Sequence, residues 1–239
     1  MSQKSFDIKV YDVDKDKRMK KINSTIREPL PKLCQHVLFC SPTNSGKSTI
    51  ILNLLKDHLA FKWDRIIFFS STWDFDIYKE FIYIDKENIH RKFDYKDLMK
   101  IVQEQETSIE ENPRKPLNTL IIFDDMQEYF RTGSILEDFL CKCRHYYITC
   151  WVVAQYVHAI SKKARQQFTC FLVFPDKINE EDKDVIGETA PIGKKKFLKA
   201  CDYVTDVIDR TGNKHNFLWI NKSLVNKYWL NFKELILLT

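Results

Sequence analysis

No apolar run in this sequence is long enough to cross a membrane. The longest extends from Tyr146 to Tyr156, whereas a membrane-spanning helix needs about 18 or more consecutive apolar residues. The first residues, Met1 to Asp7, also lack the apolar core of a secretory signal. We therefore expect no membrane span, and a protein that stays in the compartment where it is made.

The cysteines do not form the pattern of a disulfide framework or of a zinc site. Their number is odd, 7 in 239 residues, and without a secretory signal this points to free thiols in a reducing compartment. Cys141, Cys143 and His145 carry metal-binding groups, but no second Cys or His pair completes a set of four zinc ligands. Repeats, low-complexity segments, helix-turn-helix motifs and zinc fingers are absent as well. Sequence-specific binding of nucleic acid is therefore not expected.

The composition that remains is typical of a globular α/β protein of one domain. Apolar residues make up 44% and charged residues 30%, and the formal net charge of +5 permits a nucleic-acid partner without requiring one. Runs rich in β-forming residues alternate with helical patterns, which predicts a buried, mostly parallel central sheet flanked by helices. The predicted strands are His36–Cys40, Arg65–Ser70, Asn118–Phe123, Tyr147–Ala154 and Thr169–Phe174.

We divide the chain into three parts. Residues 1–32 mix acids and bases, with Pro29 and Pro31 just before the first predicted strand, and we expect an N-terminal leader that packs as an edge strand or as an arm. Residues 33–176 contain the predicted strands and form the core. Residues 177–239 follow Pro175 and combine helical patterns with short apolar runs, which predicts a helical and strand extension of the same domain.

The segment that follows the first predicted strand has the sequence of a phosphate-binding loop. It precedes a helical pattern, Lys47–Leu59, which is the context that such a loop requires. Backbone N–H groups of the loop surround the phosphates, Lys47 adds a cation near the β- and γ-phosphate oxygens, and Ser48 offers a hydroxyl to Mg²⁺. The residues predicted to bind a nucleoside triphosphate are Ser41, Pro42, Thr43, Asn44, Ser45, Gly46, Lys47, Ser48 and Thr49.

Ser41 stands where the usual pattern of this loop has its first glycine. A left-handed or crowded backbone at that position would be unfavourable for serine. Gly46, Lys47 and Ser48 carry most of the ligand chemistry, so we expect nucleotide binding to persist with a backbone that differs in detail.

A second motif ends the strand Leu120–Phe123 with two carboxylates, Asp124 and Asp125, as in a Walker B element. A carboxylate at the end of a buried strand can reach the metal that bridges the phosphates, so we assign Mg²⁺ to Asp124 together with Ser48. Asp125 is then the candidate base that polarises a water for attack on the γ-phosphate. Many P-loop hydrolases have Glu here, so the shorter Asp requires a slightly displaced water or strand end.

Three further side chains are candidates for the reaction. Gln155 follows the predicted strand Tyr147–Ala154 and can orient water at the γ-phosphate. Arg144 precedes that strand and Arg165 follows it, and either cation can stabilise the transferring phosphoryl group as an arginine finger. We prefer Arg144, although a lone surface arginine or glutamine is usually not catalytic.

These elements together resemble the viral genome-packaging ATPases of the FtsK/HerA superfamily, which occur in poxviruses, large DNA viruses of protists and virophages. The resemblance covers about Gln35 to Phe174 and rests on Gly46-Lys47-Ser48, Asp124-Asp125-Met126, Arg144-His145 and Gln155. By this resemblance, Asp125 is the catalytic base, Arg144 is a finger that acts on a neighbouring subunit, and Gln155 is a sensor.

The resemblance also implies a RecA-like P-loop NTPase core with a strand inserted between the P-loop strand and the Walker B strand. Such a protein uses ATP and Mg²⁺, assembles into a homo-oligomeric ring of five or six subunits, and moves double-stranded DNA irrespective of its sequence. Capsid vertex proteins are expected partners. The expected location is intracellular, in the host cytoplasm or a viral factory, with the virion as a further location.

Two clusters of lysine are the candidate contacts to the DNA backbone. They are Lys162-Lys163 and Lys194-Lys195-Lys196, which can neutralise phosphates without reading the bases. A run of charges is more often a solvated face, so charge alone does not decide this assignment.

Three other functions use the same motifs. A small-molecule kinase would need an acceptor pocket and a lid, for which the basic segment after Gln155 is available, but the Asp-Asp pair suits water activation better. A DNA helicase differs in opening the duplex, and the chain is short for a helicase with two cores. A scaffold that only binds nucleotide would not need a base at Asp125.

Overall fold

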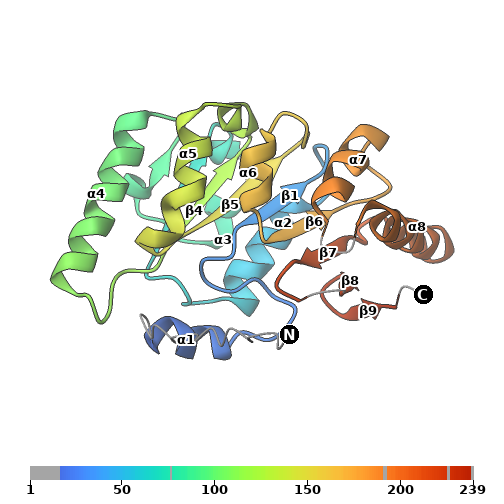
Figure 1. Cartoon of the computed structure of the whole chain (residues 1–239), viewed down its shortest axis with the longest axis horizontal. Helices are drawn as coiled ribbons and strands as arrows, with labels where there is room; N and C mark the ends of the chain where they lie inside the picture. The colour runs from blue at the N-terminus through green and yellow to red at the C-terminus, as the bar shows by residue number, and fades with distance from the viewer. Residues whose placement is uncertain (1–16, 76, 191–192, 225–226, 238–239) are drawn as a thin grey trace, which may run out of the picture.

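The centre of the molecule is one sheet of nine strands in the order β3-β2-β4-β5-β1-β6-β7-β8-β9 (Figure 1). The computed structural model describes residues 17–75, 77–190, 193–224 and 227–237. The strands are β1 (Val37–Cys40), β2 (Arg65–Ser70), β3 (Ile89–His90), β4 (Thr119–Asp124), β5 (Ile148–Ala154), β6 (Cys170–Val173), β7 (Leu218–Asn221), β8 (Tyr228–Leu230) and β9 (Glu234–Ile236). In the order of the sheet, all pairs of neighbouring strands between β3 at the edge and β6 are parallel. The pairs β6–β7, β7–β8 and β8–β9 are antiparallel.

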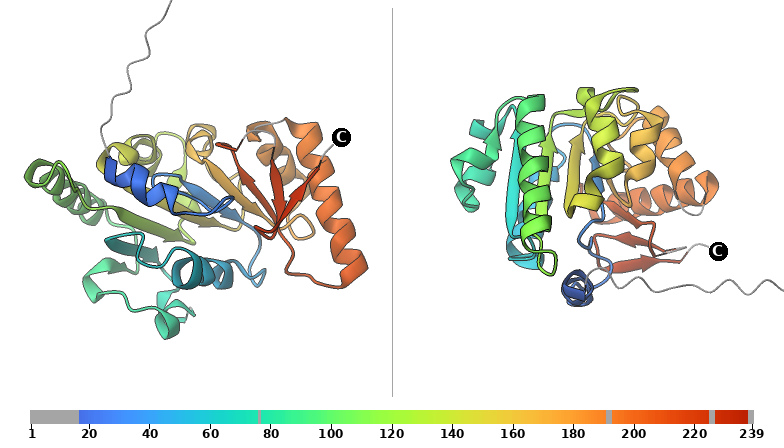
Figure 2. Two further views of the ribbon diagram at one scale, coloured as in Figure 1. Left: turned by 90° about the horizontal axis from the view of Figure 1, so that it is seen from below. Right: turned by 60° about the vertical axis from the view of Figure 1, so that its left-hand side comes forward.

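Helices cover both faces of this sheet (Figure 2). One face packs against α4 (Tyr95–Glu111), α5 (Ile135–Lys142), α6 (Lys162–Gln167), α7 (Glu180–Thr189) and α8 (Lys194–Thr211). The other face packs against α1 (Lys17–Ser24), α2 (Lys47–Asn53) with a π-helical continuation (Leu54–His58), and α3 (Tyr78–Phe81). Short 3₁₀ segments cover Trp73–Phe75, Lys86–Asn88, Gln127–Phe130 and Cys143–Tyr146. No helix in the described ranges is both long and apolar enough to span a bilayer.

Burial on both faces explains why the strands are continuous apolar runs. In β1, Leu38 and Cys40 join the apolar cluster of one face, whereas Val37 and Phe39 join that of the other. All four side chains are fully buried, as expected for a parallel sheet between helical layers. The five strands predicted from such runs are confirmed as β1, β2, β4, β5 and β6.

The strand inserted between the P-loop strand and the Walker B strand is β5. It pairs in parallel with β1 on one side and with β4 on the other. The carboxyl ends of all three strands therefore meet at one edge of the sheet, where their following residues can converge. The antiparallel strands β7–β9 continue the sheet beyond β6.

The N-terminal arm is not an edge strand where it is described. Residues Lys17–Ser24 form helix α1, whereas residues 1–16 lie outside the described part of the chain. Met19 and Ile22 are three positions apart and both pack against the apolar cluster that contains Trp63, a spacing that a helix brings to one face and a strand does not. Arg18 ties the helix to the core through two hydrogen bonds of 2.9 Å to the Asp64 carboxylate.

Candidate active site

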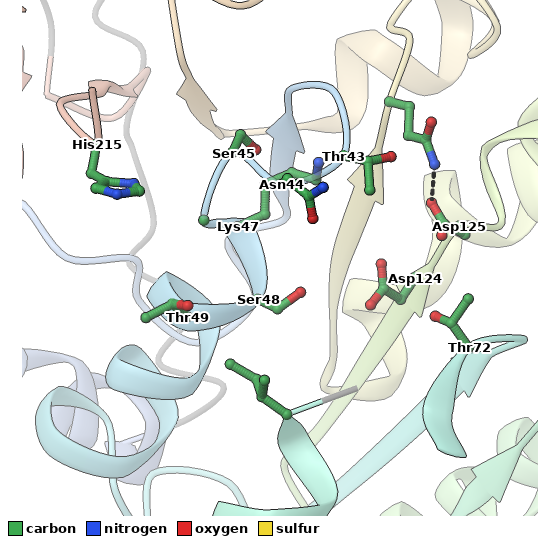
Figure 3. A pocket seen from close by; sticks show the side chains of 13 residues that line it. Thr43, Asn44, Ser45, Lys47, Ser48, Thr49, Thr72, Asp124, Asp125 and His215 are labelled. Carbon is green, nitrogen blue, oxygen red and sulfur yellow. Dashed lines mark hydrogen bonds between the residues drawn. The ribbon is translucent and has the colours of Figure 1, made fainter. Parts of the chain in front are cut away.

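The phosphate loop, the acidic pair and Gln155 lie around one cavity of about 560 Å³ at the carboxyl edge of the sheet (Figure 3). Parallel register brings them together, because Cys40 of β1 lies beside Ala154 of β5, and Val153 lies beside Asp124 of β4. The cavity is lined by Thr43, Asn44, Ser45, Gly46, Lys47, Ser48, Thr49, Thr72, Ile77, Asp124, Asp125, Gln155 and His215. Ser41 and Pro42 lie behind this surface and contact Lys47.

The phosphate loop needs a left-handed backbone at Asn44 and Gly46 but not at Ser41. The φ angles are 61° at Asn44 and 103° at Gly46, and Ser41 is not among the residues with positive φ. Asparagine tolerates this conformation better than most residues, and glycine adopts it freely. Serine therefore fits the first position of the loop without backbone strain, and the Ser41 amide donates a 3.1 Å hydrogen bond to the Ala154 carbonyl.

Lys47 is folded back onto its own loop. Its ammonium donates hydrogen bonds to the carbonyl oxygens of Ser41 and Pro42, the latter at 2.7 Å. Burial lowers the pKa of Lys47, and the nearby carboxylates of Asp124 and Asp125 oppose that shift. Phosphate oxygens would supply stronger, charge-assisted hydrogen bonds than these carbonyls, so the loop holds a cation ready for an anionic ligand.

The acidic pair ends β4 with two different environments. Asp124 is 5% exposed, and its carboxylate lies in the cavity near Ser48 and Thr72 (Figure 3). Asp125 has φ 56°, a left-handed conformation that is uncommon outside glycine, that aspartate adopts more readily than most residues, and that clusters at functional sites. The amide of Gln155 donates a 3.0 Å hydrogen bond to Oδ1 of Asp125. A left-handed backbone and a neighbouring strand thus both orient the Asp125 carboxylate.

The residues assigned to Mg²⁺ fit that ion chemically. The Ser48 hydroxyl and the Asp124 carboxylate both line the cavity, and both are hard oxygen donors of the kind that Mg²⁺ prefers in triphosphate sites. Magnesium keeps several water ligands and binds few protein groups, so one hydroxyl and one carboxylate are enough beside phosphate oxygens.

Three residues of the cavity were not predicted from the sequence. Thr72 follows β2, and its hydroxyl lies 3.2 Å from that of Ser70. Ile77 precedes α3. His215 lies in the loop between α8 and β7, and its Nδ1 is 3.5 Å from the position that a Cβ on Gly46 would take. No local motif marks these positions. His215 returns to the phosphate loop because β7 pairs with β6 in the antiparallel direction.

Neither candidate arginine finger lines this cavity. Arg144 is exposed and precedes β5, so it lies at the opposite edge of the sheet. The 7 residues of β5 separate it from Gln155, a distance of about 20 Å in a strand. Arg165, on α6, lines a second cavity with Lys162 and Lys222. Arg144 therefore cannot contact a nucleotide in the phosphate loop of its own chain.

The cysteines and histidine considered for zinc do not gather. His145 is exposed and Cys141 is half-buried, whereas Cys143 lies with Cys150 and His36 in the core. The Cys150 amide donates to Nδ1 of His36 at 3.0 Å, and Nε2 of the same ring lies 3.4 Å from the Cys143 sulfur. Because Nδ1 accepts a hydrogen bond, Nε2 carries the ring proton and is not free to bind a metal.

Two of the lysines considered for DNA are paired within the chain. The Lys163 ammonium lies 2.6 Å from the Asp138 carboxylate, and the Lys194 ammonium lies 2.8 Å from that of Asp184. The other three, Lys162, Lys195 and Lys196, are exposed, and none forms an ion pair with another described residue.

Comparison with known proteins agrees with this arrangement. The model of the family described as Poxvirus A32 protein matches residues 25–228, a range that contains every residue around the cavity. No curated protein sequence matches significantly.

Solved viral structures share the fold. The chain is similar to the genome packaging NTPase B204 from Sulfolobus turreted icosahedral virus 2 in complex with AMP, with a TM-score of 0.57 and 16% identity over 82% of this chain and 96% of that chain. For the complex with ATP-gammaS the TM-score is 0.56, with 17% identity over 84% and 98% of the two chains. The DNA-packaging ATPase B204 from Sulfolobus Turreted Icosahedral Virus gives a TM-score of 0.56 and 15% identity over 83% and 97%. These matches confirm a P-loop NTPase fold.

Proposed function

Because this chain belongs to the Poxvirus A32 protein family, we propose that it is an ATP-hydrolysing motor that moves double-stranded DNA into a viral capsid. The observation that carries the proposal is the convergence of Lys47, Asp124 and the Asp125–Gln155 pair on one cavity. A kinase or a scaffold would share the phosphate loop, but an oriented second carboxylate is what hydrolysis requires. A helicase would also hydrolyse ATP, and the chain is short for a helicase with two cores.

In this proposal, the triphosphate occupies the loop and replaces the carbonyl partners of Lys47. Backbone N–H groups at the start of α2 and the Lys47 ammonium bind its oxygens. Ser48 and Asp124 would hold Mg²⁺, which when bound would supply positive charge beside the phosphate oxygens. Asp125 accepts a proton from the attacking water, and Gln155 keeps the Asp125 carboxylate aimed at that water. Catalysis is then mainly positioning and charge stabilisation.

The motor is proposed to act as a homo-oligomeric ring in which Arg144 serves the nucleotide of a neighbouring subunit. Arg144 is exposed at the edge of the sheet opposite the phosphate loop of its own chain. A neighbouring subunit that packs against this edge would bring its own nucleotide to Arg144. A finger supplied between subunits ties hydrolysis to assembly. Capsid vertex proteins are the proposed docking partners, in the host cytoplasm or a viral factory.

The test is steady-state ATP hydrolysis by the purified full chain, with and without long duplex DNA, using Lys47→Ala as the blank. We expect stimulation by DNA irrespective of sequence. Asp125→Asn is expected to bind ATP but to hydrolyse it at least about 100-fold more slowly, whereas the same change at the exposed Asp57 leaves the rate unaltered. Normal turnover by Asp125→Asn would exclude that residue as the base. Turnover that ignores DNA, or phosphate passed to a small acceptor, would favour a kinase, whereas ATP binding without turnover would favour a scaffold.

A further inference from the structure

A second cavity, of about 490 Å³, lies away from the nucleotide site and is rich in cations. It is lined by Lys162, Arg165, Gln166, Glu188, Thr189 and Lys222. Three of these side chains are basic and one is acidic, so the lining carries a net positive charge. The residues come from α6, from the end of α7 and from the turn after β7.

This cavity lies toward the edge of the sheet opposite the phosphate loop. Lys222 follows Asn221, which pairs with Cys170, the first residue of β6. The Lys222 amide also donates a 2.8 Å hydrogen bond to the carbonyl of Thr169, just before that strand. Because β6 runs parallel to β1, the start of β6 is distant from the residues that follow β1. A ligand in the second cavity is therefore separate from the bound nucleotide.

None of the cations of the second cavity forms an ion pair within the described part of the chain, although the Glu188 carboxylate lines the same cavity. None of the ion pairs found there includes Lys162, Arg165 or Lys222. The Lys222 ammonium lies 4.9 Å from the centre of the Phe171 ring. The Arg165 guanidinium donates from Nη1 to the Ile160 carbonyl, whereas its Nε is buried without a hydrogen-bond partner. Burial lowers the pKa of both Lys222 and Arg165, and Glu188 opposes that shift at Arg165.

Three cations beside one carboxylate leave an excess of positive charge, and partly buried cations such as Arg165 and Lys222 are costly unless an anion completes the site. The contrast within the same region is informative, because Lys163 and Lys194 are both neutralised by aspartates. A guanidinium and two ammonium groups around one hollow are the donors that phosphate oxygens prefer. The lining offers neither a glycine-rich loop nor an aspartate pair for magnesium, so it suits a single phosphate group rather than a nucleoside triphosphate.

We infer that the cavity formed by Lys162, Arg165 and Lys222 binds a phosphate group of the duplex DNA backbone. The inference rests on the proposed function, which makes duplex DNA the substrate. Of the two lysine clusters predicted from the sequence it keeps Lys162, and it adds Arg165 and Lys222. The cavity binds a phosphodiester through charge and does not contact a base. Contacts of this kind do not depend on the DNA sequence, as expected for transport of any duplex.

The experiment is a titration of labelled duplex DNA with the full chain, followed by fluorescence anisotropy at several salt concentrations. The variants are Lys222→Met and Arg165→Gln, with Lys163→Met as the control that removes an already paired charge. Each contact to a backbone phosphate contributes about 0.9 to the slope of log affinity against log salt concentration. We expect Lys222→Met and Arg165→Gln each to lower the slope by about that amount for two unrelated sequences, and Lys163→Met to lower it much less.

Lys222→Arg keeps the charge, so it should retain the slope of the wild type and show that a loss in Lys222→Met is not due to misfolding. Equal slopes for wild type, Lys222→Met and Arg165→Gln would overturn the inference. So would a loss of ATP turnover with intact DNA binding, which would instead assign the cavity to the nucleotide of another subunit. If the wild type binds no duplex at all, the proposed function fails, whereas wild-type binding with unaffected variants refutes only the site.

Discussion

The side-chain amide of Gln155 donates a 3.0 Å hydrogen bond to Oδ1 of Asp125, and this contact joins the ends of two neighbouring strands. β4 and β5 pair in parallel so that Asp124 lies beside Val153. Asp125 and Gln155 come directly after these two strands and therefore lie close together. The hydrogen bond uses one oxygen of the carboxylate and leaves the other available to a water molecule.

Replacing Gln155 with alanine should slow hydrolysis more than it weakens ATP binding. Without its partner, the Asp125 carboxylate can rotate away from the attacking water, and poor positioning of a reacting group costs about 10- to 100-fold in rate. Steady-state kinetics should show kcat reduced within that range and KM little changed. Gln103→Ala, at an exposed position on α4, is the matched control. A large rise in KM with normal kcat would show that Gln155 binds ATP instead.

Nucleotide binding should take up a proton, because the pKa of Lys47 is lower in the free protein than in the complex. Burial lowers the pKa of Lys47 in the free protein, whereas phosphate oxygens favour the charged ammonium and raise its pKa in the complex. Between these two pKa values Lys47 is neutral before binding and charged after it, so ATP affinity falls as the pH rises through the lowered pKa. Calorimetry in buffers with different ionisation enthalpies measures this proton uptake. Lys47→Arg should show none, because arginine stays charged.

The sheet and the phosphate loop could be predicted because their signals are local. β1, β4 and β5 are buried on both faces, so each is a short, nearly continuous apolar run. The loop before α2 has a fixed spacing of glycine, lysine and serine. The convergence of Asp124, Asp125 and Gln155 could be predicted for a related reason, since polar residues at the ends of parallel strands meet at one edge of the sheet.

Contacts between distant segments could not be predicted in this way. His215 reaches the phosphate loop, and Lys222 reaches Arg165, only because β7 pairs with β6 in the antiparallel direction. Likewise, the sequence cannot tell a paired lysine from an unpaired one, and Lys163 is neutralised by Asp138, 25 positions earlier. Helix α1 was missed because its few apolar residues, such as Met19 and Ile22, are spread among charges.

His215 should contribute to binding of the base of ATP and not to binding of its phosphates. It lies on the far side of the phosphate loop from Asp125 (Figure 3), so a triphosphate with its γ-phosphate near Asp125 extends its nucleoside toward His215. Stacking of a base on an aromatic side chain is worth about 1 kcal/mol or more, roughly a fivefold change in affinity. His215→Ala should therefore weaken ATP binding by at least that factor and leave inorganic tripolyphosphate binding unchanged.

The control for His215 is His215→Phe, which keeps an aromatic ring and should retain most of the ATP affinity. His58→Ala removes an exposed histidine far from the loop and should have no effect. Equal losses of ATP and tripolyphosphate affinity in His215→Ala would mean that the histidine supports the loop itself, from its position beside Gly46.

Arg144→Ala should be rescued by mixing with Lys47→Ala subunits. Arg144 is exposed at the edge of the sheet opposite the phosphate loop, so it can act only on the nucleotide of another subunit. An Arg144→Ala subunit has an intact phosphate loop, and a Lys47→Ala neighbour can supply the missing guanidinium. Random mixing in equal amounts restores about a quarter of the interfaces in a ring. ATP hydrolysis of the mixture should therefore exceed the average of the two separate variants. As a control, the double variant Lys47→Ala/Arg144→Ala is mixed with Arg144→Ala, and this mixture should show no recovery because neither subunit supplies the guanidinium. A mixture that never exceeds that average, at any ratio, would exclude an intersubunit role for Arg144.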